Sequence, residues 1–148
     1  MFKHLLLVFL LTITIPSFGQ DEVSPNSFTA FDEAATFPGG MVKFFEYLRN
    51  NIVYPKDAKR QKVKGIVYIE FCIKEDGYVD KDSVRALPIE FLLENLPPNQ
   101  NAQDLKELPQ SCKDEAIRVI KNSPKWNPGK HGDTPVKQRM VLPIRFGK

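Results

Sequence analysis

Histidine is almost absent from this chain, which has two in 148 residues. The one beyond the N-terminal apolar stretch, His131, lies in a Gly/Asp turn with no cysteine or second histidine near it in the sequence. Zinc sites need several such ligands at recognisable spacings. A serine-centred glycine elbow, a phosphate-binding glycine loop and a haem-attachment sequence are missing as well. We therefore expect no metal, no cofactor and no catalytic residue, in a protein that is not an enzyme.

An excess of charge of one sign is also missing. The chain has 21 basic and 18 acidic residues, a formal net charge of +3, and the two signs are interleaved. Nucleic-acid-binding domains concentrate positive charge, so we expect no nucleic-acid partner. The densest basic stretch is either a solvated helix face or a contact for anionic lipid or cell-wall polymer. It comprises Lys56, Lys59, Arg60, Lys62 and Lys64, interrupted by Asp57.

Long apolar runs are limited to residues 5–15, a stretch shorter than the ~20 residues that a membrane-spanning helix needs. Pro16 ends it, and Ser17 and Gly19 place small residues at the third and first positions before a cut. This pattern is typical of a secretory signal peptide. We predict a signal peptide over residues 1–19, cleaved between Gly19 and Gln20, and localisation in the periplasm. An uncleaved membrane anchor is the alternative.

The first half of the remaining chain predicts two helices and a hairpin. Residues 20–36 are polar and predict a flexible lead-in, and residues 37–148 form one domain. Three- and four-residue steps predict a helix over about residues 40–50, and Pro55 starts a second, short helix. From Gly65 the period becomes two, which predicts a strand, a turn at residues 75–77 and a return strand over residues 78–86. The apolar helix positions are Met41, Phe44, Phe45 and Leu48, and the inner strand positions are Val67, Ile69, Phe71 and Ile73.

The second half predicts a helix and a final strand. The helix starts near Ser111, whose hydroxyl is a candidate N-cap, and ends before Pro124. The strand covers residues 136–146 and contains Pro143, which cannot donate a ladder hydrogen bond and therefore predicts an edge strand. Residues 87–110 have no single period and form either apolar cover for the sheet or a binding lip. The helix stripe comprises Cys112, Ala116, Val119 and Ile120, and the inner positions of the strand are Val136, Met140, Leu142, Ile144 and Phe146, interrupted by Gln138.

Cysteine is scarce, with Cys72 and Cys112 alone. Oxidising conditions outside the cytoplasm would allow them to pair. Cys72 is on the strand face opposite Ile69 and Phe71, whereas Cys112 is on the apolar stripe of its helix. If the helix covers the Ile69 face, the two sulfurs lie on different sides of the sheet and two separate thiols are expected rather than a disulfide.

The order and spacing of these motifs resemble the C-terminal domain of the TonB family over most of residues 37–146. The resemblance rests on Phe-Pro-Gly-Gly at 37–40, Asn-Ile-Val-Tyr-Pro at 51–55, the alternating strand that ends in Glu-Asp-Gly at 75–77, Pro-Lys-Trp-Asn-Pro-Gly at 124–129 and Val-Leu-Pro-Ile-Arg-Phe at 141–146. Its structural signature residues are Pro38, Gly39, Gly40, Tyr54, Pro55, Ala58, Gly65, Gly77, Ala116, Trp126, Pro128, Gly129 and Pro143.

The resemblance implies an α+β fold with helices packed on one face of a three-stranded antiparallel sheet. It also implies that the last strand binds the TonB-box peptide of an outer-membrane receptor by strand addition, in transmembrane transport. If Pro143 faces the open edge, the backbone groups of Lys137, Arg139, Val141 and Arg145 face it too and would hold the incoming strand. A second copy of the chain is another partner that an open edge admits. Pro143 is equally interpreted as protecting the edge from aggregation.

The chain departs from the family ahead of the domain. An energy transducer of this kind has an inner-membrane helix and a long proline-rich spacer, through which the motor proteins ExbB and ExbD act. Neither segment is present, so we expect the receptor-contacting domain without the usual coupling to that motor. The alternative is a partner protein linked to ExbB and ExbD that supplies the missing anchor. The alternative function is a structural or sensory periplasmic domain that binds cell-wall polymer or another protein.

Overall fold

The computed structural model describes residues 32–95 and 105–147. The predicted signal peptide over residues 1–19, its cleavage point between Gly19 and Gln20, and the lead-in as far as residue 31 lie outside the described residues. Among the described residues, no helix combines the length and the apolar character needed to cross a membrane.

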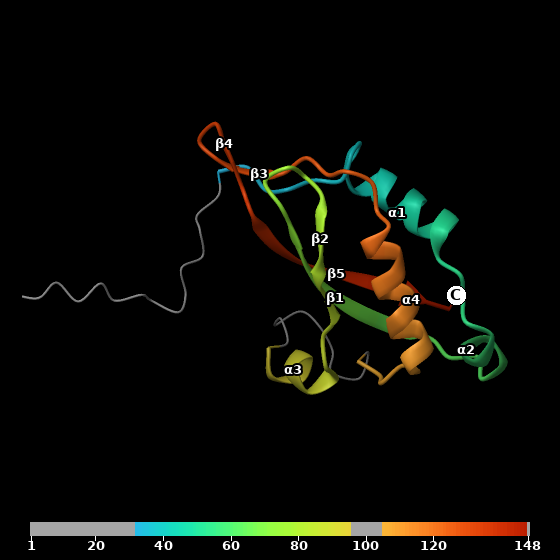
Figure 1. Ribbon diagram of the computed structural model, residues 1–148. Coiled ribbons are helices and arrows are strands. Elements are labelled where there is room, and N and C mark those ends of the chain that lie inside the picture. Colours follow the sequence, from blue (N-terminus) through green and yellow to red (C-terminus); the bar gives the residue numbers. More distant parts are fainter. Residues whose placement is uncertain (1–31, 96–104, 148) are drawn as a thin grey trace, which may run out of the picture.

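A three-stranded antiparallel sheet, in the order β2-β1-β5, forms the centre of the domain (Figure 1). The central strand β1 (Gly65–Ile73) is followed by β2 (Val79–Ala86) through a tight turn. The last strand, β5 (Gln138–Phe146), pairs with the other side of β1 along the whole length of β1. The predicted α+β class and the three-stranded antiparallel sheet are therefore confirmed, and the strand that contains Pro143 lies at an edge.

The helix α4 (Gln110–Lys121) buries its apolar stripe in the core, and α1 (Gly40–Asn51) buries Phe44 and Leu48 there (Figure 1). A hydrogen bond connects the two helices, because the Tyr47 hydroxyl of α1 donates to the Val119 carbonyl of α4 at 2.8 Å. The short helices are α2 (Lys56–Arg60) and α3 (Ile89–Glu94). A small hairpin of β3 (Gly129–His131) and β4 (Thr134–Val136) extends beyond the sheet.

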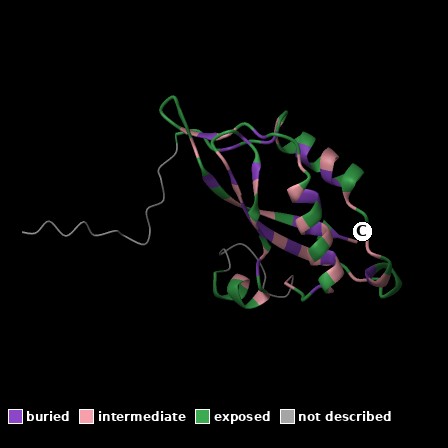
Figure 2. Ribbon diagram, viewed as in Figure 1, coloured by how far each residue is buried: buried purple, intermediate pink, exposed green. Residues whose placement is uncertain are grey.

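The core lies between the inner face of the sheet and the helices (Figure 2). All four predicted inner positions of β1 and all four residues of the predicted α4 stripe are buried, as their periods of two and 3.6 require. Trp126 lies at the centre of an aromatic cluster, with ring centroids at 5.1 Å from Phe37, 5.6 Å from Phe44 and 5.6 Å from Phe71. Edge-to-face packing of this kind adds to the free energy gained from burial.

The β1–β2 turn is attached to this aromatic cluster through Gly77. Its φ of 86° is in the left-handed region, and the Trp126 N–H donates a hydrogen bond to its carbonyl at 2.8 Å. A Cβ atom at this position would lie closer than 3.0 Å to the Trp126 carbonyl oxygen. Glycine is therefore required here by both the turn and the close approach of a second backbone.

Other signature residues also have structural roles. Gly65 makes room for Leu108, because a Cβ atom there would lie 2.6 Å from the Leu108 Cδ1 atom. The Tyr54 hydroxyl donates a hydrogen bond to the Val63 carbonyl and so fixes the loop after α2. Ala58 and Ala116 are completely buried where larger side chains would not fit. These positions build the scaffold and do not form a site.

Several local predictions are wrong. Ser111 does not cap α4, because its hydroxyl donates to the Asp57 carboxylate at 2.7 Å and Pro109 occupies the N-cap position. The described end of the predicted lead-in, residues 32–36, belongs to the domain, since it forms bridges with residues 127–130. Ala35 is buried there, and its N–H donates to the Gln138 side chain at 2.6 Å. The predicted final strand is divided into β4 and β5.

The cysteines lie on different sides of the sheet and are both free. Cys112 is in the core under α4, and Cys72 is half-buried on the opposite face of β1. The expectation of two separate thiols is confirmed.

Candidate functional site

The sheet has two edge strands, β2 and β5, and β5, which pairs with β1 without the irregularity of the β1–β2 pairing, is the candidate for binding a partner strand. β5 pairs with β1 on one side, and no strand among residues 32–95 and 105–147 pairs with its other side. Such an edge presents a row of backbone donors and acceptors to a further strand. The question is then which residues of β5 direct their backbone groups outward.

The hydrogen bonds of β1 answer this question. The Leu87 N–H donates to the Tyr68 carbonyl at 2.9 Å, so the backbone groups of Tyr68 point toward β2 and away from β5. Tyr68 lies opposite Pro143, which therefore directs its own carbonyl to the open edge. By alternation, the backbone groups of Arg139, Val141 and Arg145 point the same way.

The open edge is therefore an incomplete ladder. Arg139, Val141 and Arg145 each offer an N–H and a carbonyl, whereas Pro143 offers its carbonyl alone. Lys137, predicted with this set, lies in the link between β4 and β5 and outside the strand. Its amine donates to the Asp80 carboxylate at 2.7 Å, which lowers the pKa of Asp80 and raises the pKa of Lys137. Lys137 thus joins β5 to β2 across the sheet.

The outward-facing residues of β5 present their side chains on the sheet face opposite the helices. All four are exposed, Val141 to 44%. Beside them, the buried carboxylate of Glu70 accepts a hydrogen bond from the Arg85 Nε atom at 2.5 Å and lies 3.3 Å from the Arg139 guanidinium. Two arginines share this one carboxylate, which leaves an excess of positive charge next to the edge.

An open groove of about 610 Å³ adjoins the C-terminal half of β5. Phe45 of α1 is 53% exposed at this groove, although its spacing predicts an inward position. The groove thus combines apolar surface with two guanidinium groups beside the open edge. Its lining comprises Phe45, Leu48, Arg49, Ile52, Ile66, Tyr68, Pro143 and Arg145.

Sequence reasoning missed the α1 side of this groove. Met41 and Phe45 share a helical period with the buried Phe44 and Leu48, but Met41 is 46% exposed. The sequence did contain one indication of this exposure, which is the width of the apolar stripe. Four apolar residues within residues 41–48 cover more of the helix surface than the core can bury. Arg49 had no signal in the sequence, because its position depends on how α1 lies beside β5.

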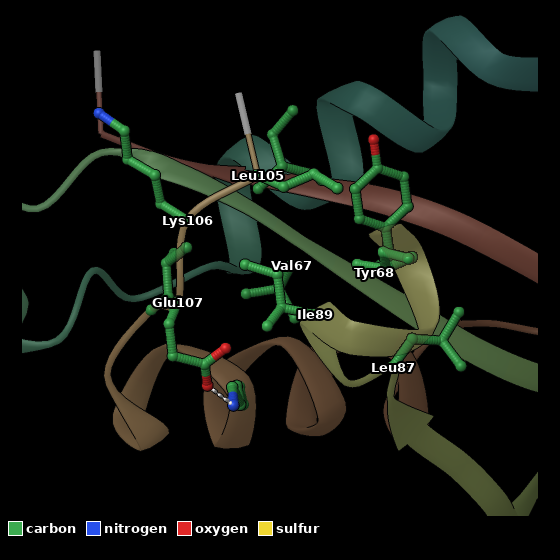
Figure 3. Close-up of a pocket in the computed structure, with 11 residues that line it drawn as sticks. Val67, Tyr68, Leu87, Ile89, Leu105, Lys106 and Glu107 are labelled. Carbon is green, nitrogen blue, oxygen red and sulfur yellow. Dashed lines mark hydrogen bonds and ion pairs between the residues drawn. The ribbon is translucent and has the colours of Figure 1, made fainter. Parts of the chain in front are cut away.

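In the segment over residues 87–110, residues 87–92 and 105–108 line a second, much smaller hollow next to the same end of β1, because Ile66 and Tyr68 line both hollows (Figure 3). Figure 3 shows Val67 and Ile89 close together in the middle of this hollow, with Leu105 above them, while Glu107 forms an ion pair with Lys113. The hollow measures about 20 Å³, which is room for about one water molecule. The described parts of this segment therefore act as cover for the sheet, with Leu87 and Leu108 buried.

The predicted binding lip has partial support in α3. Phe91 and Leu93 are each 48% exposed, and no residue of α3 is buried. The prediction depends on four apolar residues, of which Leu92 is half-buried and Leu96 lies outside the described residues.

The remaining candidate sites are less developed. The five basic residues between Lys56 and Lys64 are all exposed on and after α2, and none forms an ion pair with another described side chain. No group of three or more metal-ligating side chains occurs among the described residues.

Neither the scan against models of known protein families nor the search of curated proteins found a match.

Proposed function

We propose that this protein is a peptide-binding module that takes an extended segment of a partner protein as an additional strand on β5. The observation that carries this proposal is the open edge, where three N–H groups and four carbonyls of alternate residues point away from β1. In strand addition, backbone hydrogen bonds supply affinity and neighbouring side chains supply selectivity. The groove with Phe45 provides such a side-chain contact next to the strand.

The partner class follows from the resemblance to the TonB C-terminal domain. We propose that the segment is the TonB box of an outer-membrane receptor and that the protein acts in the periplasm, in transmembrane transport. The three-stranded antiparallel sheet with an open last strand supports this proposal, because that is the arrangement the resemblance implies.

A titration of isotope-labelled protein with TonB-box peptides tests the proposal. Amide signals of Arg139, Val141 and Arg145 should shift and become protected from hydrogen exchange, because their N–H groups gain partners. The N–H groups of Met140 and Leu142 already face β1 and should be protected before peptide is added. Unchanged amide signals along β5 at millimolar peptide would refute strand addition.

Alternate N-methylation of the peptide provides a matched control. Alternate amides of the bound peptide face β5. Methyl groups on these amides remove the N–H donors to β5 and should abolish binding. The same number of methyl groups on the other amides faces solvent and should leave most of the affinity intact. Equal effects of the two sets of methyl groups would exclude a backbone ladder.

A second candidate function rests on the basic stretch from Lys56 to Lys64. Five exposed positive charges around a short helix match an anionic cell-wall polymer. Binding to purified polymer that weakens steeply as salt rises, and that is lost when Lys59 and Arg60 are both changed to glutamine, would support this function. Binding that is independent of salt would argue against it.

A further inference from the structure

We propose that the strand accepted by β5 carries acidic residues at two positions six residues apart, and that the two arginines that select it, together with Pro143, disfavour pairing of β5 with a second copy of itself. This inference rests on the proposed function and specifies its partner. It follows from the arrangement of Arg139 and Arg145 on one face of the edge strand.

Arg139 and Arg145 are both available to a partner. Their side chains point to the same face because they are separated by an even number of residues. The side chain of Arg139 is 62% exposed and shares the Glu70 carboxylate with Arg85. Arg145 is exposed and forms no ion pair with any other side chain in the described part of the chain. An incoming strand therefore meets two positive charges that are not fully neutralised.

These charges disfavour a symmetric β5–β5 pair. In the antiparallel register that overlaps all of β5, centred on Leu142, Arg139 lies opposite Arg145 of the other copy, and this happens twice. Like charges directly opposite each other destabilise a strand pair. A register centred on Val141 avoids this clash but sets Arg139 opposite Pro143, which has no N–H to donate. The first register therefore contains two repulsive contacts between arginines, and the second lacks two hydrogen-bond donors.

An acidic partner removes the conflict. Carboxylates at positions i and i+6 of the added strand lie next to the two arginines, and residues i+2 and i+4 cover Val141 and Pro143. Val141 is 44% exposed, so apolar residues fit at these two positions. Each cross-strand ion pair contributes about twofold to fivefold in affinity, and the two together about fourfold to twenty-fivefold.

Three nine-residue synthetic peptides test this inference. The first has glutamate at its second and eighth positions, valine at its fourth and sixth, and serine or threonine elsewhere. This pattern reads the same in both directions, so it is independent of strand orientation. The second peptide has the same composition with the glutamates moved to positions three and seven, which face the other side of the strand. The third has lysine in place of the two glutamates.

We expect the first peptide to bind about fourfold to twenty-fivefold more tightly than the other two in calorimetric titrations at low salt, with this advantage shrinking at high salt. Equal binding of the first two peptides would overturn the acidic spacing and leave strand addition intact. Failure of all three to shift the Arg139, Val141 and Arg145 amides would instead refute the proposed function.

Arg145→Glu is the matching variant of the protein. It should bind a fourth peptide, in which lysine replaces one of the two glutamates of the first peptide, more tightly than the first peptide. Lys59→Glu, with the same change in charge on α2, should still bind the first peptide most tightly. Arg139→Gln is the milder variant at the second position, because a new carboxylate there would face Glu70. Unchanged peptide order in Arg145→Glu, or a dimer in analytical ultracentrifugation with protected β5 amides, would overturn the inference.

Discussion

Replacing Gly77 with alanine should destabilise the domain through the contact between the β1–β2 turn and Trp126. The left-handed φ of 86° alone costs a residue with a Cβ atom about 1–2 kcal/mol. The Cβ atom would also lie closer than 3.0 Å to the Trp126 carbonyl, so the turn and the tryptophan must separate. This movement weakens the 2.8 Å hydrogen bond between them, worth about 1 kcal/mol, and disturbs aromatic packing, for about 1–3 kcal/mol more.

Comparison with Gly132→Ala isolates the second contribution, which is the close contact between Gly77 and Trp126. Gly132 also has a positive φ, of 57°, but a Cβ atom there meets no other atom within 4 Å. It should therefore lose about 1–2 kcal/mol, from the backbone conformation alone. Urea denaturation followed by tryptophan fluorescence measures both variants, and Gly77→Ala should be less stable than Gly132→Ala by about 2–4 kcal/mol. Equal free energies of unfolding, within 0.5 kcal/mol, would show that the approach of Trp126 to the turn does not constrain Gly77.

Three further perturbations follow from the edge strand and the helices. Pro143→Val restores an N–H at the open edge and so adds one hydrogen bond to the peptide, worth about 1 kcal/mol. Calorimetry should therefore show peptide binding that is about fivefold tighter. Unchanged affinity would contradict the placement of the Pro143 backbone at the open edge. Glu70→Gln removes the buried charge shared by two arginines and should cost about 1–3 kcal/mol in urea denaturation, whereas Glu46→Gln, in an exposed pair with Lys43, should leave the free energy of unfolding almost unchanged. The pKa of Glu115 is lowered from its ordinary value of 4.5, chiefly by a hydrogen bond from Arg118, so its stabilising effect is complete above pH 4.5 and is lost as pH falls through the lowered value. Glu115→Gln should reduce the loss of stability on acidification, and an unchanged pH profile would rule out this contribution.

Periodic features of the fold could be predicted from the sequence because each depends on neighbours along the chain. Alternation in β1 and the 3.6-residue stripe of α4 identified buried residues correctly, and Pro143 identified the edge strand. The candidate edge followed from the same alternation. Lys137 was assigned to the strand wrongly, since a short link between β4 and β5 leaves no mark in the pattern of apolar residues.

Features that depend on distant residues could not be predicted. Gln138 interrupts an apolar series because its side chain accepts the N–H of Ala35, which is 103 residues away in the sequence. The Ser83 hydroxyl takes the place of a backbone carbonyl in the β1–β2 ladder by accepting the Cys72 N–H at 2.8 Å, where the pairing of the two strands shifts register. A hydroxyl that substitutes for a backbone group has no periodic signature. The α1 side of the groove was missed for a similar reason, because it depends on the placement of a helix.

The pairing of β5 with β1 has a mechanical consequence. Nine consecutive residue pairs, from Gly65 with Phe146 to Ile73 with Gln138, connect these two strands. Tension applied to a peptide added along β5 acts parallel to the strands and loads these hydrogen bonds in shear, all at once. Tension perpendicular to β5 would break them one after another from one end. The domain should therefore resist a pull along its edge strand much better than a pull across it.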